Sequence, residues 1–549
     1  MSEKKSSEFP SHDELNIAGN VPLPAPPPFP DIELIKSNTP FDKTYQQNIL
    51  TTAKGGSISF IGRTFEYFVR FIFSILVARA IGAEQYGLYT LGLTIIPILS
   101  MLALLGLQTG VVAYLAPAIR ENNEKKIWGI IQISAGIPAL LSILFGISLF
   151  LLAKPVAIQG FQDPRLIPLF QIVSVSIPMD AISFIAYQII ISYKKPQYSV
   201  LANNVVLPVV KLLLSIGFLA LGMGVTGIIL AHVIASAFGF ILIIYYVNSL
   251  FSLKRTLTPT KQLTVQLLKY SLPVHLGWVL NTIRGTLETL VLGFVGLISG
   301  VGIFAVASRI STLGTLLFLS VGNISTPLIA EFHNRGEMGQ LERLYKTTTK
   351  WVLMFNLPLF LTFVFFSKPI LSIFGADFTN GSTALVVLAV GNLVYTGTGI
   401  GANILDMTNH TKFNSINSAI LIVVTITTDL LLIPRWGVIG AAAASSFSTV
   451  IVNLICLIEV YILLKIRPYG REIIKPLLAI SMTAVILVLI NPLLVLPTFW
   501  HLVVGGLVLW SVYTLILTRL GFSEEDLLIL SKIHSRFISL NPFRRSVAL

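Results

Sequence analysis

Gly87-Leu-Tyr-Thr-Leu91 returns 215 residues later as Gly302-Ile-Phe-Ala-Val306. Three further pairs lie at nearly the same separation: Lys154-Pro155 with Lys368-Pro369, Gln197-Tyr198-Ser199 with Lys412-Phe413-Asn414, and Gly224-Val-Thr-Gly227 with Gly437-Val-Ile-Gly440. All four separations fall between 213 and 215 residues, so the register barely drifts. Many transporters use such a duplication to place one substrate path between two pseudo-symmetric halves.

The composition is that of a membrane protein. Of the 549 residues 54% are hydrophobic and 11% are charged, and the mean hydropathy is +0.82; a soluble domain has roughly 25% charged residues. Fourteen apolar stretches can each supply the roughly 20 residues of a membrane-crossing helix. They lie near 55–80, 87–116, 128–152, 166–192, 198–221, 226–248, 267–295, 300–328, 347–367, 381–405, 413–433, 437–464, 474–495 and 500–518. We predict an all-α polytopic protein with about 14 transmembrane helices: two pseudo-symmetric six-helix lobes plus two extra C-terminal helices.

These stretches divide the chain into five expected parts. They are a disordered, proline-rich tail (1–52), an N-lobe (53–265), a C-lobe (266–465), the added helix pair (466–521) and an amphipathic C-terminal tail (522–549). The first tail contains Val21-Pro-Leu-Pro-Ala-Pro-Pro-Pro-Phe-Pro30 and no apolar helix, which indicates a polyproline II spacer and not a signal peptide.

The basic residues predict the orientation. With a cytoplasmic N-terminus, the tails, the inner loops and the inner ends of the spans hold 28 of the 38 Lys and Arg residues, and the outer loops hold only Lys154, Arg165, Lys368 and Arg435. This bias follows the positive-inside rule. We therefore expect a multi-pass protein of the plasma (inner) membrane with both termini and the 329–350 loop in the cytoplasm. Because the basic residues are dispersed over short loops, nucleic acid is not an expected partner.

The sequence lacks the motifs of several kinds of chemistry. The sequence has neither a G-x-x-x-x-G-K-[ST] loop nor H-E-x-x-H. Cys456 is the only cysteine and lies in an apolar stretch, which excludes a disulfide framework and a cysteine metal site. The outer loops are too short to house a sugar-transferring site. We predict no enzyme, no catalytic residue, no metal and no cofactor.

Ionisable residues inside the spans are functional candidates, because each costs a few kcal/mol to bury. Arg63, Glu66 and Arg70 have the i, i+3, i+7 spacing that places them on one face of the first helix. Asn281, Arg284 and Glu288 have the same spacing in the seventh helix, the first of the second repeat. Pseudo-symmetry would turn both stripes toward a shared central cavity.

Arginine suits a phosphate path because its fork of donors binds phosphate oxygens in pairs and keeps its charge. With Arg309 of the eighth helix, the arginines form a predicted ladder from the inner third to the outer side. The alternative is mutual neutralisation, of Arg63 or Arg70 by Glu66 and of Arg284 by Glu288. Even then, the four arginines of these helices would exceed the two glutamates by two positive charges. Lys211 is a further candidate for the substrate, and Glu66, Glu288 and Asp429 are candidates for ion coupling.

Two segments resemble a known family. Ala78-Arg-Ala-Ile-Gly-Ala-Glu-Gln-Tyr-Gly-Leu-Tyr-Thr-Leu91 is similar to the junction of helices one and two in Wzx-type polysaccharide flippases of the multidrug/oligosaccharidyl-lipid/polysaccharide exporter superfamily. Val301-Gly-Ile-Phe-Ala-Val-Ala-Ser-Arg-Ile-Ser311 is similar to that family's eighth helix. The resemblance covers about residues 54–465 and implies a cationic cavity, alternating access and a polyprenyl-(pyro)phosphate-linked oligosaccharide as cargo. The family's cavity arginines carry over to Arg63, Arg70, Arg284 and Arg309; the proline-rich tail is a departure.

The expected function is therefore a flippase that moves a lipid-linked oligosaccharide from the cytoplasmic to the outer leaflet for cell-surface polysaccharide synthesis. Its expected partners are this substrate, membrane lipids, and a polysaccharide polymerase or glycosyltransferases. Three alternatives stay open: a lipid II-type flippase, a cation-coupled drug or metabolite antiporter of the same superfamily, and a non-transporting scaffold. An antiporter site should be acidic and aromatic, whereas the surplus here is cationic.

Overall fold

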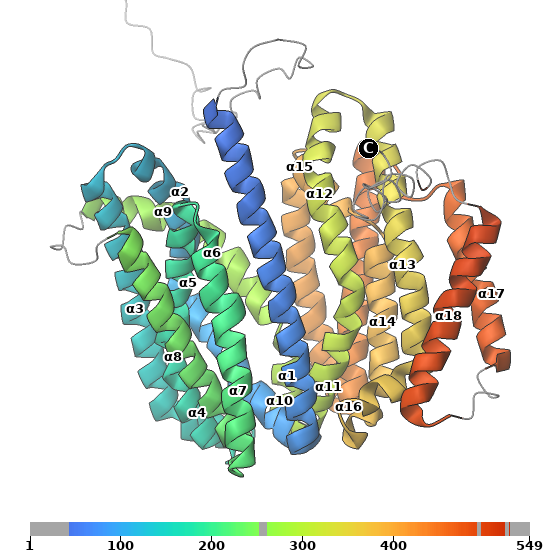
Figure 1. The fold of residues 1–549 in the computed structure, drawn as a ribbon, viewed down its shortest axis with the longest axis horizontal. Helices are drawn as coiled ribbons and strands as arrows, with labels where there is room; N and C mark the ends of the chain where they lie inside the picture. Colours follow the sequence, from blue (N-terminus) through green and yellow to red (C-terminus); the bar gives the residue numbers. More distant parts are fainter. Residues whose placement is uncertain (1–42, 252–260, 491–495, 522–525, 527–549) are drawn as a thin grey trace, which may run out of the picture. The chain divides into compact units, whose positions relative to one another are not determined.

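The computed structural model describes residues 43–251, 261–490, 496–521 and 526, with side chains from residue 56 onward. The predicted proline-rich tail and C-terminal amphipathic tail lie almost entirely outside these ranges. Lys54–Leu549 forms one unit. Every regular element in the described part of this unit is a helix, as the sequence predicts (Figure 1).

The elements follow one another in two runs. The first run comprises α1 (Lys43–Leu104), α2 (Leu107–Arg120), α3 (Glu124–Pro155), η1 (Val156–Gly160), α4 (Leu166–Ser174), α5 (Ser176–Ser192), α6 (Pro196–Ser199), η2 (Val200–Val206), α7 (Leu207–Ala220) and α8 (Gly224–Leu250). The second comprises α9 (Lys261–Arg284), α10 (Leu287–Phe294), α11 (Ile298–Ser311), η3 (Thr312–Gly314), α12 (Thr315–Asn334), α13 (Met338–Ser372), η4 (Ala376–Gly381), α14 (Ser382–Gly397), α15 (Gly401–Met407) and α16 (Thr411–Leu464). The appended elements are η5 (Arg471–Ile473), α17 (Ile474–Ile490) and α18 (Thr498–Leu520).

The predicted number of membrane crossings agrees with these helices. Among the described residues, 11 helical segments are long and apolar enough to cross a membrane. Two of them bend sharply, at Gly82 (φ 74°) in α1 and at Gly437 (φ 55°) in α16, so each supplies two crossings. The pair α9 and α10 supplies one more, which accounts for fourteen.

The duplication is also visible in the backbone. Five turns of the first half contain a residue with positive φ, and five turns of the second half contain one 213 to 215 residues later. The pairs are Gly82 with Gly296, Asn122 with Gly336, Gln162 with Gly375, Lys194 with Asn409, and Gly224 with Gly437. Left-handed backbone is unusual for residues other than glycine, so its recurrence marks equivalent turns.

One predicted helix is broken. The sequence pattern predicts a continuous helix over 267–295, but α9 ends at Arg284 and α10 begins at Leu287. Asn281 and Arg284 therefore lie on one helix and Glu288 on the next, so the expected three-residue stripe is wrong here. Packing explains the difference, since α9 packs against α2 of the first half whereas α10 packs against α16. One straight helix cannot satisfy both contacts.

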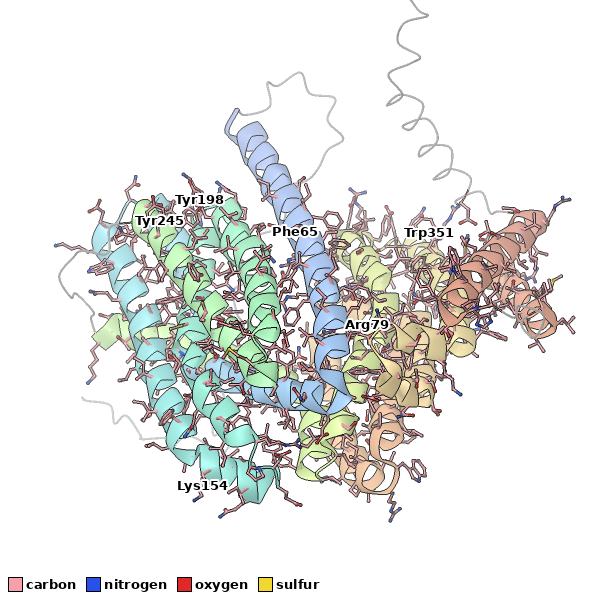
Figure 2. All side chains as sticks on the ribbon, turned by 60° about the horizontal axis from the view of Figure 1, so that its bottom comes forward. Phe65, Arg79, Lys154, Tyr198, Tyr245 and Trp351 are labelled. Atoms are coloured by element: carbon pink, nitrogen blue, oxygen red, sulfur yellow. The ribbon has the colours of Figure 1, made fainter. Side chains whose placement is uncertain are left out.

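The buried apolar residues are arranged differently at the two ends of the helices. One core joins both halves and contains Tyr86, Phe161, Ile298 and Phe378. These residues lie near the end of the helices where α1 bends at Gly82 and Glu84 follows, which we call the Glu84 end. At the opposite end each half has its own core, one with Ile127 and Val247 and the other with Tyr345 and Ile404. The two halves thus pack tightly at the end expected to face outward. In Figure 2 Lys154 lies at this end, away from Tyr198 and Tyr245.

The added pair packs on the second half. α17 and α18 contact each other and α13, and they share a small apolar core with it (Figure 1). Tyr513 of α18 donates a hydrogen bond to the carbonyl of Met354 on α13 (3.0 Å).

Candidate functional site

A cavity of about 750 Å³ lies among α1, α5, η2, α8 and the last turn of α9. We call it the arginine cavity. Arg63, Glu66 and Arg70 all line it from α1, as their spacing predicts. Its other polar lining residues are Ser100, Asp180, Ser183, Tyr187, Gln188, Asn203, Asn204, His232, Ser236 and Thr282. This set combines the guanidinium groups of Arg63 and Arg70 with two carboxylates, Glu66 and Asp180, and with many neutral hydrogen-bonding groups. Guanidinium groups suit a phosphate, and neutral hydrogen-bonding groups suit a sugar.

The three charged residues of α1 are unequally paired. Arg70 Nη2 lies 2.6 Å from Glu66 Oε1, and the Asn204 amide donates to the other carboxylate oxygen of Glu66. No such ion pair is found for Arg63 among the described residues. Glu66 thus neutralises one arginine as the alternative reading expects, but Arg63 keeps the α1 wall positive.

The second predicted stripe meets the cavity only at its edge. Thr282 lines the cavity. Two residues later, the guanidinium of Arg284 donates to the Asn281 amide oxygen at 3.4 Å, and both side chains lie at the end of α9. The end of α9, the first helix of the second repeat, therefore reaches the cavity. Asn281 and Arg284 themselves lie outside the cavity lining.

Arg309 lies in a tight contact between the two halves. Its Nη1 donates to Ser74 Oγ (2.6 Å) and to Tyr86 Oη (3.1 Å), both on α1. Lys211 lies near by, with its ammonium 4.9 Å and 5.3 Å from the ring centres of Phe73 and Tyr89. Aromatic faces attract such cations. In this conformation these two cations are held by α1 and do not line the cavity.

The two acidic candidates of the second half lie together. Packing of α10 on α16 brings Glu288 beside Asp429. Asp429 is fully buried, and neither of its carboxylate oxygens has a hydrogen-bond partner among the described residues. Glu288 is 9% exposed and lies beside Ser445. An isolated buried carboxylate is costly, so this pair needs a proton or a cation to compensate it.

Near the Glu84 end α1 and α11 meet through two glycines. A Cβ atom at Gly302 would lie 2.1 Å from the Ala83 carbonyl oxygen, and one at Gly87 would lie 1.9 Å from that of Ile298. No side chain fits at either position. This glycine contact, made by Gly87, Gly302, Ala83 and Ile298, holds α1 and α11 together at this end. Gly87 and Gly302 are equivalent positions of the repeat, so the duplicated stretch forms the contact.

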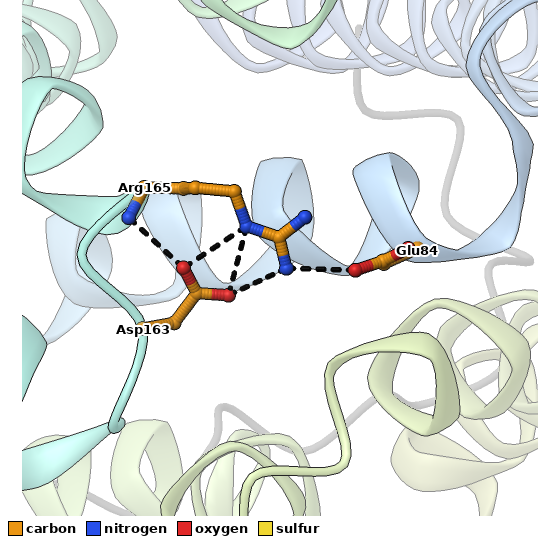
Figure 3. Close-up of polar contacts among 3 residues, drawn as sticks. All are labelled: Glu84, Asp163 and Arg165. Atoms are coloured by element: carbon orange, nitrogen blue, oxygen red, sulfur yellow. Dashed lines mark hydrogen bonds and ion pairs between the residues drawn. The ribbon is translucent and has the colours of Figure 1, made fainter.

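An ion-pair cluster lies at the same end (Figure 3). Arg165 Nη2 lies 2.7 Å from both Glu84 Oε1 and Asp163 Oδ2, which ties the bend of α1 to the loop before α4. Hydrogen bonds from Arg165 hold the pKa of the Asp163 carboxyl below its usual range. The basic-residue pattern predicts an outer loop for Arg165 but does not pair it with Glu84 or Asp163.

Sequence reasoning also missed most of the neutral cavity lining. Asn203 and Asn204 line the cavity from η2, a π-helical segment in the middle of an apolar span. Two consecutive asparagines within an apolar span are a detectable signal, because burying an unpaired amide there is costly. Among the described residues, no group of three His, Cys, Asp or Glu side chains is arranged to hold a metal ion.

Comparison with curated proteins finds two flippases of Haloferax volcanii. The "Probable flippase AglR" is 28% identical over 236 residues, which are 41% of this chain and 47% of that protein. The "Probable low-salt glycan biosynthesis flippase Agl15" is 24% identical over 181 residues, 33% of this chain and 38% of the other. Each alignment thus spans less than half the length of the relative.

Solved structures share the fold. The "Lipid II flippase MurJ, inward closed conformation" aligns with 87% of this chain and all of that chain, with a TM-score of 0.68 and 19% identity. A multidrug resistance MATE family transporter of the MOP superfamily, in its inward-facing conformation, covers 73% of this chain with a TM-score of 0.60 and 16% identity. At these identities the likeness concerns the fold alone.

Two family models match the sequence. MatE matches residues 273–431 in the second half. The model described as "Polysaccharide biosynthesis protein" matches residues 52–333, just over half of the chain. The match includes α5, α8 and the part of α1 that lines the arginine cavity. The chain therefore belongs to the polysaccharide biosynthesis protein family of the multidrug/oligosaccharidyl-lipid/polysaccharide exporter superfamily.

Proposed function

We propose that this multi-pass membrane protein is a flippase for a polyprenyl-(pyro)phosphate-linked oligosaccharide. It would move the sugar head from the cytoplasmic to the outer leaflet by alternating access, without making or breaking a covalent bond. The two Haloferax volcanii relatives named as flippases support this class of function.

The observation that carries the proposal is the arginine cavity. Arg63 and Arg70 supply guanidinium forks for the phosphate oxygens, and the neutral amides and hydroxyls around them suit sugar hydroxyl groups. In the proposed cycle Arg284 and Asn281, at the edge of the cavity, and Arg309 and Lys211, held by α1, contact the substrate once the glycine contact opens. Separation of the halves would release Arg309 from Ser74 and Tyr86.

The alternatives differ in what they transport. A lipid II-type flippase would use the same phosphate contacts with a different sugar, and a drug antiporter would need an acidic, aromatic cavity. A scaffold for a polymerase or glycosyltransferases would not need Arg63 and Arg70 for its activity. The uncompensated charge of Arg63 favours an anionic substrate.

Flipping in reconstituted vesicles tests the proposal. The substrates are a polyprenyl-pyrophosphate oligosaccharide, lipid II and phosphatidylcholine, each with a fluorescent head that an impermeant reductant bleaches only in the outer leaflet. We expect the protein to expose the inner-leaflet oligosaccharide lipid to the reductant, but not phosphatidylcholine. Faster flipping of lipid II would favour that alternative. If the protein accelerated flipping of neither the oligosaccharide lipid nor lipid II, the proposed function would be refuted.

We propose that the termini are cytoplasmic, from the basic-residue bias. Single cysteines at Asn380 and Gly339 test this orientation, since Asn380 is exposed and a Cβ at Gly339 meets no other atom. The native Cys456 is buried and gives a low background. In intact cells an impermeant maleimide should label Asn380→Cys and spare Gly339→Cys. The opposite labelling would invert every assignment of side.

Glu66, Glu288 and Asp429 are the proposed ion-coupling residues, with Asp429 the principal one. Because its buried carboxylate lacks a partner, binding of Na⁺ or a proton there would relieve the cost of burial. We expect an inward-directed gradient of one of these ions to speed flipping by the wild type, and Asp429→Asn to abolish this response. Asp406→Asn is the control, because Asp406 already accepts from Asn414. An unchanged gradient response in Asp429→Asn would exclude this role.

A further inference from the structure

A second polar pocket lies where α13 meets the start of α17. Its lining residues are distant in the sequence from those of the arginine cavity. The pocket has a volume of about 270 Å³. Arg343, Lys346, Thr347 and Lys350 line it from α13, and their spacing places all four on one face of that helix. Pro468, Gly470, Arg471, Glu472 and Ile473 complete the lining. None of these residues takes part in the proposed transport path.

Among the described residues, the lining has an excess of basic side chains. It contains four basic side chains and one acidic one. Lys350 is buried at the base, where its ammonium lies 2.9 Å from Glu472 Oε2 and 2.9 Å from Asp526 Oδ1. Lys346 Nζ lies 2.8 Å from Glu342 Oε1. Even when Glu342 and Asp526 are counted, basic groups outnumber acidic groups by four to three.

The pocket lies at the depth of a lipid headgroup. On α13 the apolar run begins directly after Lys350, with Trp351 and Val352, and on α17 it begins directly after Lys475, with Pro476 and Leu477. Tryptophan at the start of a span is typical of the membrane–water interface. Figure 2 shows Trp351 at the same end of the helices as Tyr198.

An apolar surface continues from the pocket into the membrane. Ile474 and Leu477 of α17 are 52% and 44% exposed. They follow η5, which carries the basic lining residue Arg471, and offer a surface for acyl chains. A free phosphate would use only the basic end, so the combination of both surfaces favours a lipid.

We propose that this pocket binds the phosphate headgroup of an anionic phospholipid, with Arg343 and Arg471 at its mouth and the acyl chains along α17. Basic pockets between helices on the cytoplasmic side are typical sites for such headgroups. The lipid would hold the added α17–α18 pair against α13. The inference does not depend on the proposed transport function.

Native mass spectrometry of the full-length protein in neutral detergent, titrated with phosphatidylglycerol or phosphatidylcholine, tests the site. We expect tighter binding of phosphatidylglycerol, and the double variant Arg343→Ala, Arg471→Ala should weaken it about twenty-five-fold, since each surface arginine contributes about five-fold. Both side chains are exposed, so the fold should tolerate their loss. The control is Lys465→Ala, Arg467→Ala, which removes two charges that pack on Tyr461 outside the pocket.

The results separate the possible ligands. Arg343→Lys, Arg471→Lys should retain most of the binding, because the charge remains. Equal loss in the pocket and control variants would overturn the site, as would equal affinity for the two lipids. If millimolar inorganic phosphate displaced phosphatidylglycerol fully from the wild type, the ligand would be a free phosphate, and the lipid assignment would fall. The readout is binding alone, so a failure of the flipping experiment leaves it unaffected.

Discussion

Arg70→Ala is expected to slow flipping of the oligosaccharide lipid at least about ten-fold while leaving the protein folded and inserted. A hydrogen bond between charged groups contributes about 1.5–3 kcal/mol, and about 1.4 kcal/mol corresponds to a factor of ten. The effect on folding should be smaller. The Arg70 side chain is 61% exposed, and an exposed pair such as Arg70–Glu66 contributes only about 0–1 kcal/mol. Initial flipping rates and thermal unfolding of the same preparation measure the two effects separately.

A double-mutant comparison separates a phosphate ligand from a charge partner. If Arg70 only neutralises Glu66, then Arg70→Ala with Glu66→Gln should flip like the wild type, because no unpaired carboxylate remains. If Arg70 binds phosphate, the double variant should stay slow, and Arg70→Lys should recover in part because an ammonium lacks the paired donors. Arg79→Ala is the matched control, on the same helix but outside the cavity. Full recovery in the double variant would remove Arg70 from the proposed substrate path.

The two arginine stripes show what local sequence can predict. For Arg63, Glu66 and Arg70 the helical spacing suffices, because α1 is continuous over these residues and all three line one cavity. The same reasoning fails for Glu288, since the break after Arg284 depends on α9 packing against α2 and α10 against α16. These contacts join segments more than 100 residues apart along the chain. No periodicity within the seventh span encodes them.

Arg309 illustrates a second limit. Its sequence context correctly predicts an arginine within the eighth helix, but its present partners, Ser74 and Tyr86, come from the other half. Which residues an intramembrane cation contacts depends on how far the two halves have closed. Sequence alone does not select one conformation of a protein that must alternate between two. The repeat places Gly87 and Gly302 at equivalent positions, but their close contact is visible only in the structure.

Gly302→Val should abolish flipping, because the halves could no longer close at the Glu84 end. The smallest side chain at this position would meet the Ala83 carbonyl oxygen at 2.1 Å and the Gly87 nitrogen at 3.0 Å. Both are backbone atoms, which no change of rotamer can move away. Ordinary overpacking costs about 1–3 kcal/mol after repacking. Here relief requires α1 and α11 to separate, so the variant should favour a conformation that is open at this end.

Accessibility of the cavity tests this shift directly. Ser183 lines the arginine cavity, and Ser183→Cys should be shielded from an impermeant maleimide added at the Glu84 end as long as the glycine contact is closed. Adding Gly302→Val should expose this cysteine and stop flipping together. Gly136→Val is the control, since a Cβ at Gly136 meets no atom within 4 Å and the same change there should alter neither property. Normal flipping with no gain in labelling would mean that the glycine contact does not gate the path. If flipping were lost without any gain in labelling, the halves would have stayed closed. The glycine contact would then serve only to pack the helices.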